Sequence, residues 1–415
     1  MNFFLTLITI LFLSSCSSFE NKKVADIQKY DIELPKNFID QSGGFEPAIG
    51  SSIDFSKKLD NGNLEFFAIS DRGPNYPIKD TNKIVMFYPQ FSPTIVKIEI
   101  EPNVKAIVKS FMNIKYSGKA ITGLNVNQEG KDEEIYDVNL NKIVPNFGLD
   151  TESIAIMKNG NFVIGDEYYP SISVVDSKTG NIIKRLTPGN GLPEVLKYRN
   201  FNRGFEALAV APNGKIYAIL EGVLNLDAHS NKNGKFIRLL EIDLEASNVK
   251  TYAYPFDYLK YKDSSKVKIG DIAAIDNENF LIVEQGPTID KKYTNIIYKI
   301  SLQDATDISN IKLANGQELE YGDFADLKNI QFITKKLILS PRNYGWEEDK
   351  LEGLTIIDST SIAITNDTDF AIKGYKSIDV ECVKGREHTC KKNVPIMDQK
   401  DHKTKLWIIK FTDKL

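Results

Sequence analysis

The chain has 415 residues, enough for a sizeable core, and its 42% hydrophobic and 26% charged residues exclude the disordered, collagen-like and disulfide-scaffold classes. A formal net charge of −4 and an isoelectric point near 5.7 argue against nucleic acid as a partner. With only 3 histidines and 3 cysteines, the chain has no multi-cysteine zinc or iron–sulfur site, and a histidine-rich metal site is disfavoured.

An apolar run at positions 3–13 opens the chain; it is too short to span a bilayer and is typical of a signal peptide. It ends in the sequence LSSC at Cys16, which resembles the lipobox of bacterial lipoproteins, where cleavage precedes an acylated cysteine. We therefore expect removal of residues 1–15 and export of the mature domain, 16–415, with Cys16 lipidated. Ser17 after the cysteine favours the outer membrane, facing the periplasm. No lysine or arginine precedes the run, so an ordinary cleaved signal remains the alternative.

Five segments share one pattern: an acidic residue, an apolar strand, a turn with Asn, Asp, Gly or Ser, a second apolar strand and another acidic residue. They span residues 44–71, 150–167, 204–221, 270–284 and 351–367. Strand–turn–strand segments with such turn residues are β-hairpins. Further strands follow most of them, at 95–100, 171–176, 236–243, 295–301 and 405–411.

Repeated four-stranded antiparallel units predict an all-β fold, a β-propeller with blades around a central funnel. We count five repeats. A sixth blade stays open because residues 104–146 are unassigned, and a β-sandwich is the alternative fold. The N-terminal strand at 25–34 is expected to pair with the strand at 405–411 and so close the ring.

Cys382 and Cys390 flank a short segment near the C-terminus. Because exported proteins can form disulfides, we expect a bond between them that staples this loop. Two free thiols are the alternative.

The two acidic residues of each hairpin should lie near one another, because the start of the first strand and the end of the second meet at one end. Since the innermost strands line the channel, all five pairs are expected around one mouth. The pairs are Glu46/Asp71, Glu152/Asp166, Glu206/Glu221, Asp271/Glu284 and Glu352/Asp367. Like charges ~4 Å apart repel by roughly 4 kcal/mol at an effective dielectric near 20, so such a ring needs cations, raised pKa values or arginines. Oxygen ligands favour Ca²⁺, with Mg²⁺ or Mn²⁺ as alternatives.

Two arginines lie beside these acids: Arg72 directly follows Asp71, and Arg203 stands three residues before Glu206. Arginine holds phosphate or carboxylate in a planar fork, which lysine does less well. Carboxylates for a metal together with arginines for an anion suit an enzyme that acts on a phosphorylated substrate. The alternative is that both arginines neutralise acids in structural ion pairs.

Three segments carry a resemblance to a known family: ISDRGPN at 69–75, DTESIAIMKNGNFVIGDEYYPSI at 150–172 and NRGFEALAVAPNGKIYAILEG at 202–222. Together they resemble the family called esterase-like activity of phytase, or phytase-like domain. Thr151 replaces a proline of the family pattern and Ala207 a glycine, and both changes keep the charged residues. The resemblance extends over about 40–370 and implies hydrolysis of esters or phosphoesters.

The resemblance and the acids together favour a metal-dependent hydrolase of small anionic, phosphorylated substrates. Its predicted metal ligands are Glu46, Asp71, Glu152, Glu206 and Glu352. Asp166 or Glu221 would act as the base, and the anion would bind Arg72 and Arg203. A non-catalytic propeller that binds a ligand or an envelope partner is the alternative. The chain contains no G-x-S-x-G elbow, Gly-rich phosphate loop or dinucleotide fingerprint, and we expect a monomer.

Overall fold

The computed structural model describes residues 22–124, 133–145, 147–381, 389–398 and 403–415. Cys16 and Cys382 lie outside these ranges, so lipidation of the first and pairing of the second stay predictions. Cys390 is disulfide-bonded. None of the helices in the described ranges combines the length and the apolar character that a membrane span requires.

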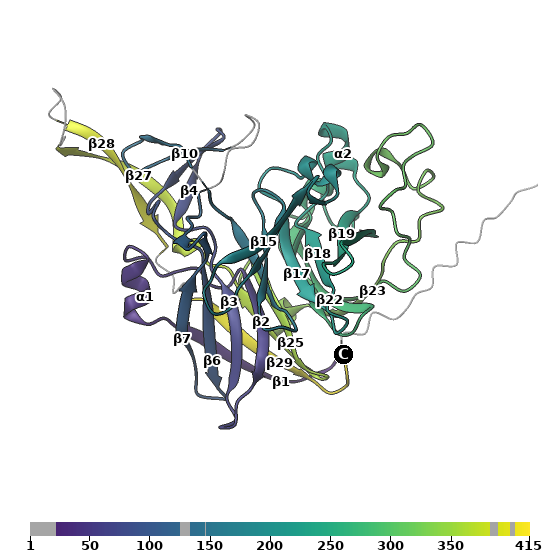
Figure 1. Ribbon diagram of the computed structural model, residues 1–415, viewed down its shortest axis with the longest axis horizontal. Coiled ribbons are helices and arrows are strands. Elements are labelled where there is room, and N and C mark those ends of the chain that lie inside the picture. Colours follow the sequence, from purple (N-terminus) through teal and green to yellow (C-terminus); the bar gives the residue numbers. More distant parts are fainter. Residues whose placement is uncertain (1–21, 125–132, 146, 382–388, 399–402) are drawn as a thin grey trace, which may run out of the picture.

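The fold is a β-propeller, and the described residues form five four-stranded antiparallel blades (Figure 1). Blade 1 comprises β2 (Ser52–Lys58), β3 (Leu64–Ile69), β6 (Thr94–Glu101) and β7 (Lys105–Asn113). Blade 2 comprises β12 (Thr151–Ile156), β13 (Phe162–Asp166), β14 (Ser171–Val175) and β15 (Ile182–Pro188), with the short β16 (Gly191–Leu192) at its edge. Blade 3 comprises β17 (Phe205–Val210), β18 (Ile216–Leu220), β19 (Ile237–Asp243) and β20 (Asn248–Tyr254). Blade 4 comprises β21 (Lys268–Ala274), β22 (Asn279–Pro287), β23 (Tyr293–Ser301) and β24 (Thr334–Leu339), and blade 5 comprises β25 (Leu351–Asp358), β26 (Ser361–Asn366), β29 (Lys405–Phe411) and β1 (Val24–Glu33).

The first strands of the blades close a ring: β2, β12, β17, β21 and β25 each contact the next, and β25 contacts β2. β1 pairs antiparallel with β29, with Val24 opposite Phe411, so the N-terminal strand completes blade 5 as predicted. A short parallel ladder between β1 and β7 joins blades 1 and 5 into one eight-stranded sheet. Because β2 contacts β12 directly, the segment 104–146 adds no blade between them.

Burial explains why the strands near the channel are apolar on both faces. Each of these strands lies between two neighbouring blades, and all residues of β18 are buried, whereas β15 at an outer edge is half-buried or exposed. The largest apolar cluster lies between blades 2, 3 and 4, where each buried leucine or isoleucine contributes about 1.5–3 kcal/mol. The hairpin turns of blades 2 and 3 use Gly160 and Gly214 at φ values of 82° and 87°, which glycine adopts without strain.

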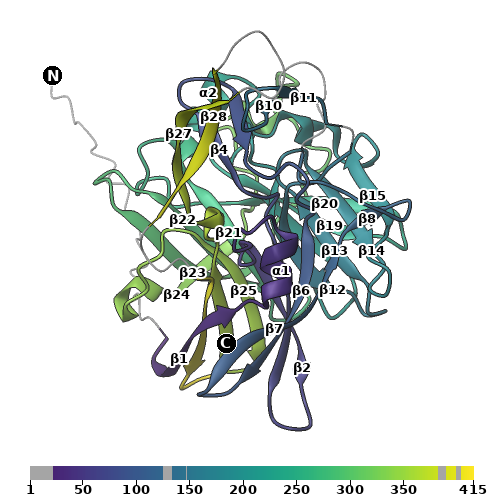
Figure 2. The same cartoon turned by 90° about the vertical axis from the view of Figure 1, so that its left-hand side faces the viewer.

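Two additions lie at one end of the propeller (Figures 1 and 2). One is a small sheet of β4 (Asn75–Ile78), β5 (Lys83–Met86), β10 (Glu134–Tyr136) and β11 (Lys142–Ile143). The other is the hairpin of β27 (Ile372–Glu381) and β28 (Thr389–Met397). They pack together through an edge-to-face contact between Tyr76 and Tyr375, whose ring centroids are 6.2 Å apart. Since β27 follows β26 closely, these additions stand beside the end of the channel where the first strands begin.

The remaining elements are short. They are α1 (Lys36–Gln41), β8 (Lys115–Tyr116), β9 (Lys119–Ala120), α2 (Ala228–Asn233) and 3-10 turns at Glu194–Tyr198, Ser264–Lys266, Leu319–Tyr321, Pro341–Tyr344 and Asp369–Ala371.

Candidate functional site

A β-bulge recurs where the first strands of blades 2, 3 and 5 begin, and in each case the extra residue is a glutamate. These bulge glutamates are Glu152, Glu206 and Glu352. A bulge leaves one residue unpaired and turns its side chain away from the regular pleat. All three are buried, and their carboxylate oxygens come within 4.8 Å of one another. Three equivalent backbone irregularities thus bring one carboxylate from each of three blades to a common point.

A second set of carboxylates follows the second strand of blades 1, 2, 3 and 5. In each blade the regular ladder begins with one residue pair, such as Ser52–Ile69 in blade 1 and Ala207–Ile219 in blade 3. The acid stands two residues after the second member of that pair. These strand-end acids are Asp71, Glu167, Glu221 and Asp367. Because the register is the same in all four blades, they surround the same end of the channel as the bulge glutamates.

Both sets belong to one connected group, because four carboxylate triads with ligand oxygens within 4.8 Å share members. The triads are Asp71/Asp150/Glu152, Asp71/Asp367/Asp369, Glu152/Glu206/Glu352 and Glu167/Glu206/Glu221. We call these nine carboxylates the acidic mouth. The sequence-based expectation of a carboxylate funnel at one end of the channel therefore matches the geometry for Asp71, Glu152, Glu206, Glu221, Glu352 and Asp367.

Four cationic side chains in the described structure pair with members of the acidic mouth. Arg72 contacts Asp150 at 3.4 Å, as well as Glu133 at 2.9 Å. Lys350 lies 2.7 Å from both Asp367 and Asp369. Nine carboxylates against four cations leave an excess of five negative charges when all of these groups are ionised.

The other two cations, Arg203 and Lys268, meet at one carboxylate. The Nε atom of Arg203 lies 3.1 Å from Glu221, and Lys268 also pairs with this carboxylate. Arg203 in addition donates a hydrogen bond of 3.0 Å to the Val267 carbonyl. In this arrangement Arg203 acts as a counter-ion of the mouth, which was the structural alternative in the sequence analysis.

Burial and crowding raise the proton affinity of the acidic mouth. Burial raises the pKa of Asp71 to about 7, and the Asp150 carboxylate adds to this rise. Burial raises the pKa of Glu352 to about 8, although Lys350 opposes the shift. The pKa of Glu206 lies well above its usual range, first through burial and then through the charge of Glu352. The excess charge is thus balanced either by protons or by bound cations.

Several carboxylate oxygens in the mouth lack donors. Among the described residues, no hydrogen bond or ion pair reaches the side chain of Glu152 or Glu206. Asp150 is 1% exposed, and neither of its oxygens accepts a hydrogen bond, although the Arg72 guanidinium lies 3.4 Å from one of them. Convergent, buried oxygen acceptors without donors are what a hard divalent cation requires, so the residues present fit Ca²⁺, Mg²⁺ or Mn²⁺.

The structure does not bring every predicted acid to the mouth. Glu46 is exposed, and Ser51 occupies the place in blade 1 that corresponds to the bulge glutamates. Asp271 lies deeper in the channel, where both oxygens accept backbone N–H bonds of 2.8 Å, from Ile272 and Leu354. Glu284 accepts hydrogen bonds from Tyr254 at 2.7 Å and Lys335 at 2.7 Å, away from the acidic mouth.

The prediction for Asp166 was wrong by one position. Its oxygens accept hydrogen bonds from Ser171 at 3.1 Å and Arg185 at 3.2 Å, within its own blade. The next residue, Glu167, points into the acidic mouth in its place. Glu167 stands as far from Glu152 as Glu221 does from Glu206 and Asp367 from Glu352, so Glu167 is the equivalent repeat position. Asp166, one residue earlier, points to the other face of the sheet.

Lys268 and Lys350 were missed by the sequence analysis. Each stands two residues before the bulge position of its blade, and Asp150 holds the same place in blade 2. Recurrence of charged residues at this repeat position is the signal that could have identified them.

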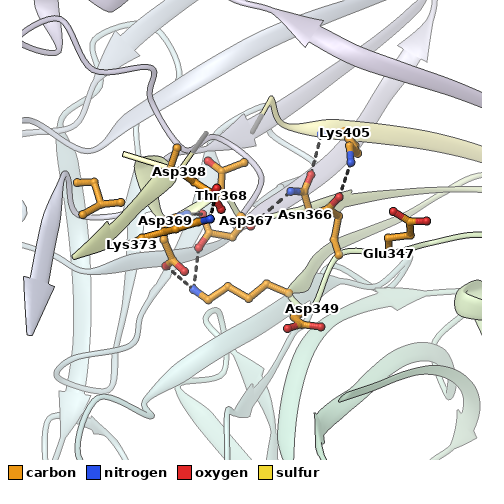
Figure 3. Close-up of a pocket in the computed structure, with 13 residues that line it drawn as sticks. Glu347, Asp349, Asn366, Asp367, Thr368, Asp369, Lys373, Asp398 and Lys405 are labelled. Atoms are coloured by element: carbon orange, nitrogen blue, oxygen red, sulfur yellow. Dashed lines mark hydrogen bonds and ion pairs between the residues drawn. The ribbon is translucent and has the colours of Figure 1, made fainter. Parts of the chain in front are cut away.

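A pocket of about 500 Å³ adjoins the mouth and shares Lys350, Asp367 and Asp369 with it (Figure 3). Figure 3 shows Asp367 and Asp369 side by side in this pocket, with Lys405 and Glu347 further along it. The backbone beside it is strained: Asp369, Phe370 and Ala371 adopt φ values of 46°, 53° and 58°. Left-handed backbone of this kind costs about 1–3 kcal/mol per non-glycine residue and is typical of functional sites. Burial of the Phe370 ring, 5.1 Å from that of Phe91, holds the turn in place.

Comparison with known proteins identifies relatives. A protein of Arthroderma benhamiae, described as an uncharacterized secreted protein, is 25% identical over 191 residues. The alignment covers 36% of this chain and 37% of that protein, so it spans little more than a third of the relative's length.

Distant solved structures include a hypothetical protein from Leishmania major, at 8% identity and a TM-score of 0.40, which covers 93% of this chain and 90% of that chain. The catalytic domain of a GH62 α-L-arabinofuranosidase from Coprinopsis cinerea has 9% identity and a TM-score of 0.38, covering 95% and 99%. Virginiamycin B lyase from Staphylococcus aureus has 10% identity and a TM-score of 0.31, covering 93% and 99%.

A family model described as phytase-like, esterase-like activity of phytase, matches residues 51–370. This range contains most of the chain and all nine carboxylates of the acidic mouth. The chain therefore belongs to the phytase-like family, as the three sequence segments indicated.

Proposed function

We propose that this protein is a divalent-metal-dependent hydrolase of phosphate esters. The observation that carries the proposal is the convergence of Glu152, Glu206 and Glu352 from equivalent bulges of three blades, within an excess of buried carboxylates. Membership of a family described by its esterase-like activity supports a hydrolytic reaction. An oxygen-only donor set favours Ca²⁺, with Mg²⁺ or Mn²⁺ as alternatives.

A cation held by the bulge glutamates would supply Lewis-acid polarisation of a phosphoryl oxygen and a lowered pKa for a bound water. In the hydrolysis, a water oxygen bonds to phosphorus while the ester P–O bond breaks, and the alcohol leaves after taking up a proton. We assign Glu167 as the acceptor of the water proton. Asn202 orients this carboxylate through a hydrogen bond of 2.7 Å, and burial raises its pKa, which strengthens it as a base.

The proposal gives Glu221 and the two arginines supporting roles. Glu221 is already paired with Arg203 and Lys268, so Glu167 replaces it as the base. Arg72 and Arg203 hold the carboxylates of the mouth in position instead of clamping the substrate.

Export completes the proposal. The apolar leader at 3–13 and the similarity to a secreted protein support an exported chain, 16–415, released from a signal at 1–15. Acylation of Cys16 would anchor it firmly when several acyl chains are attached, on the periplasmic face of the outer membrane.

The test is a phosphoester panel assayed with the mature chain before and after chelation. We expect activity to be lost with chelator, to return with added Ca²⁺, and to fall at least a hundredfold in Glu206→Gln, about 2.7 kcal/mol. Glu241→Gln is the matched control, because this carboxylate of β19 pairs with Lys215 outside the acidic mouth. Hydrolysis that survives chelation and Glu206→Gln unchanged would refute metal dependence, and a chain inactive on the whole panel would leave the non-catalytic binding role.

A further inference from the structure

Blade 4 breaks the pattern that the other blades follow at the mouth. At the two repeat positions that hold the bulge glutamates and strand-end acids, blades 1, 2, 3 and 5 each supply at least one carboxylate. Blade 4 supplies Gly270 and Gln285 instead, and Lys268 stands two residues before the glycine. On this side the mouth therefore offers an ammonium and an amide without a carboxylate, whereas blade 5 offers Lys350 together with Glu352 and Asp367.

The donors of blade 4 share one face of its sheet. Lys268 and Gln285 are direct partners in the antiparallel ladder between β21 and β22, so their side chains emerge on the same face. Lys268 extends to Glu221 of blade 3, and its charge also acts on Glu206 and Glu352. It is therefore inside the mouth, beside the bulge glutamates.

The amide of Gln285 is held in one orientation. Its Oε1 accepts hydrogen bonds from the Leu351 backbone at 2.9 Å and from Asn295 at 3.0 Å. Its Nε2 lies beside Gly270, 3.1 Å from where a Cβ atom of that residue would stand, and the Leu351 carbonyl oxygen lies even closer to the same point. Gln285 is 0% exposed, yet Nε2 has no hydrogen-bond acceptor. Such a buried, unpaired donor costs about 1–3 kcal/mol, so its retention points to an acceptor supplied by a ligand.

A third donor lies close by. Tyr293 begins β23 of the same blade and is half-buried. Burial raises the pKa of its phenol, and the charges of Lys268, Glu352 and Glu221 also act on it. Blade 2, by contrast, contributes Asp150, Glu152 and Glu167 to the acidic mouth. The mouth therefore presents carboxylates at blade 2 and hydrogen-bond donors at blade 4.

We propose that blade 4 forms the anion-binding side of the mouth, where Lys268, Gln285 Nε2 and the Tyr293 hydroxyl donate to the oxygens of a phosphoryl group. This inference rests on the proposed function and deepens it, because it assigns the orientation of the substrate. The phosphoryl oxygens meet donors at blade 4 and face the carboxylate-held cation on their other side. A phosphate monoester and free phosphate share this chemistry, so both are tested.

The experiment titrates inorganic phosphate, and in a separate arm an aryl phosphate monoester, into the Ca²⁺-loaded mature chain by calorimetry. Gln285→Glu keeps the size and the acceptor oxygen but replaces the amide donor with a fifth strand-end carboxylate. We expect phosphate affinity to fall at least tenfold while Ca²⁺ affinity stays the same or rises. Lys268→Met should weaken phosphate to a similar extent, whereas the control Lys215→Met, which removes a lysine paired with Glu241, should not.

The outcomes separate the two proposals. Unchanged phosphate and monoester affinity in both Gln285→Glu and Lys268→Met, with Ca²⁺ still bound, overturns the anion site and leaves the metal site standing. If the wild-type chain binds no Ca²⁺, metal dependence falls, and the same titration without metal decides the anion site. In that case, loss of phosphate binding in Gln285→Glu supports the anion site, and binding equal to that of the wild type overturns it. If the wild-type protein binds neither phosphate nor the monoester, the anion site is also overturned. Tighter binding of the monoester than of phosphate assigns the site to the substrate.

Discussion

The same five first strands line both ends of the central channel, yet the two ends have opposite chemistry. One end is the acidic mouth, with nine carboxylates in connected triads. The other end is a narrow pocket of about 80 Å³. Its lining is Ile53, Asp54, Ile154, Ala155, Leu208, Ala209, Val210, Ile272, Ala273, Ala274, Leu354, Thr355 and Ile356. Asp54 is the one carboxylate in that lining.

Backbone regularity separates the two ends. Beyond the mouth, the first two strands of blades 2, 3 and 4 pair without interruption, as at Ala209–Tyr217 and Ala155–Val163, and mostly apolar residues line the narrow channel. At the mouth, the bulges of blades 2, 3 and 5 each turn a glutamate out of the regular ladder. One unpaired glutamate in each of these three strands thus brings carboxylates together at the mouth.

The largest effect should come from placing a charge at the apolar end. Ala209→Asp buries a carboxylate in a pocket without a cationic partner, and we expect it to lower the free energy of unfolding by about 3–5 kcal/mol. Denaturant unfolding followed by circular dichroism measures this. Ala209→Ser, polar but uncharged, is the control and should cost much less. Equal stabilities of the Asp and Ser variants would contradict the contrast between the two ends.

Removal of divalent cations should lower the stability of the folded chain through the acidic mouth and not through the opposite end. A cation that binds only the folded chain stabilises it by about 2.7 kcal/mol at a hundredfold excess over Kd. Adding Ca²⁺ to chelated protein should therefore raise the melting temperature, and Glu206→Gln should abolish most of this rise. Asp54→Asn, at the opposite end, should leave the Ca²⁺-induced rise intact. A melting temperature that ignores both chelator and Ca²⁺ would rule out the cation site.

Asp54 should make the free energy of unfolding depend measurably on pH. Burial raises its pKa to about 6 from an ordinary value near 3.8, although it accepts hydrogen bonds from the Ile156 backbone and the Thr355 hydroxyl. Because the folded chain then binds a proton more tightly than the unfolded chain, stability should fall as pH rises from about 4 to about 6. Asp54→Asn should remove this part of the fall, which unfolding curves at several pH values can resolve. A variant profile parallel to that of the wild type would show that Asp54 titrates normally.

The smallest effect is expected for Arg203→Lys. As a counter-ion of Glu221, the side chain needs charge more than a planar fork, so stability should change by less than about 1 kcal/mol. Turnover of a phosphoester should stay within about threefold of wild type, a difference below 1 kcal/mol. A tenfold fall in activity with an unchanged fold would instead restore Arg203 as the clamp of the substrate anion.

The blades could be recognised in the sequence because alternation and turn chemistry are local properties. Apolar runs flanking turns such as Asn159–Gly160 predict hairpins wherever they stand in the chain, and the closing strand at 25–34 was predicted in the same way. Glu152 and Glu206 were identified for a related reason: each opens a hairpin within a segment that carries the family resemblance, and both lie in the acidic mouth.

Which charged groups meet was decided by the tertiary structure. Glu167 lies in the mouth, whereas Asp166 is bound by Ser171 and Arg185 within its own blade. Glu284 turns away because Tyr254 and Lys335 bind it. These outcomes depend on register and on contacts between blades, such as the hydrogen bonds from Leu354 to Asp271 and from Ile154 to Ser52. Hairpin formation depends on neighbours a few residues apart, and the sequence by itself determined that much. The acidic mouth depends on partners about a hundred residues apart, whose positions exist only once the ring of five strands has closed.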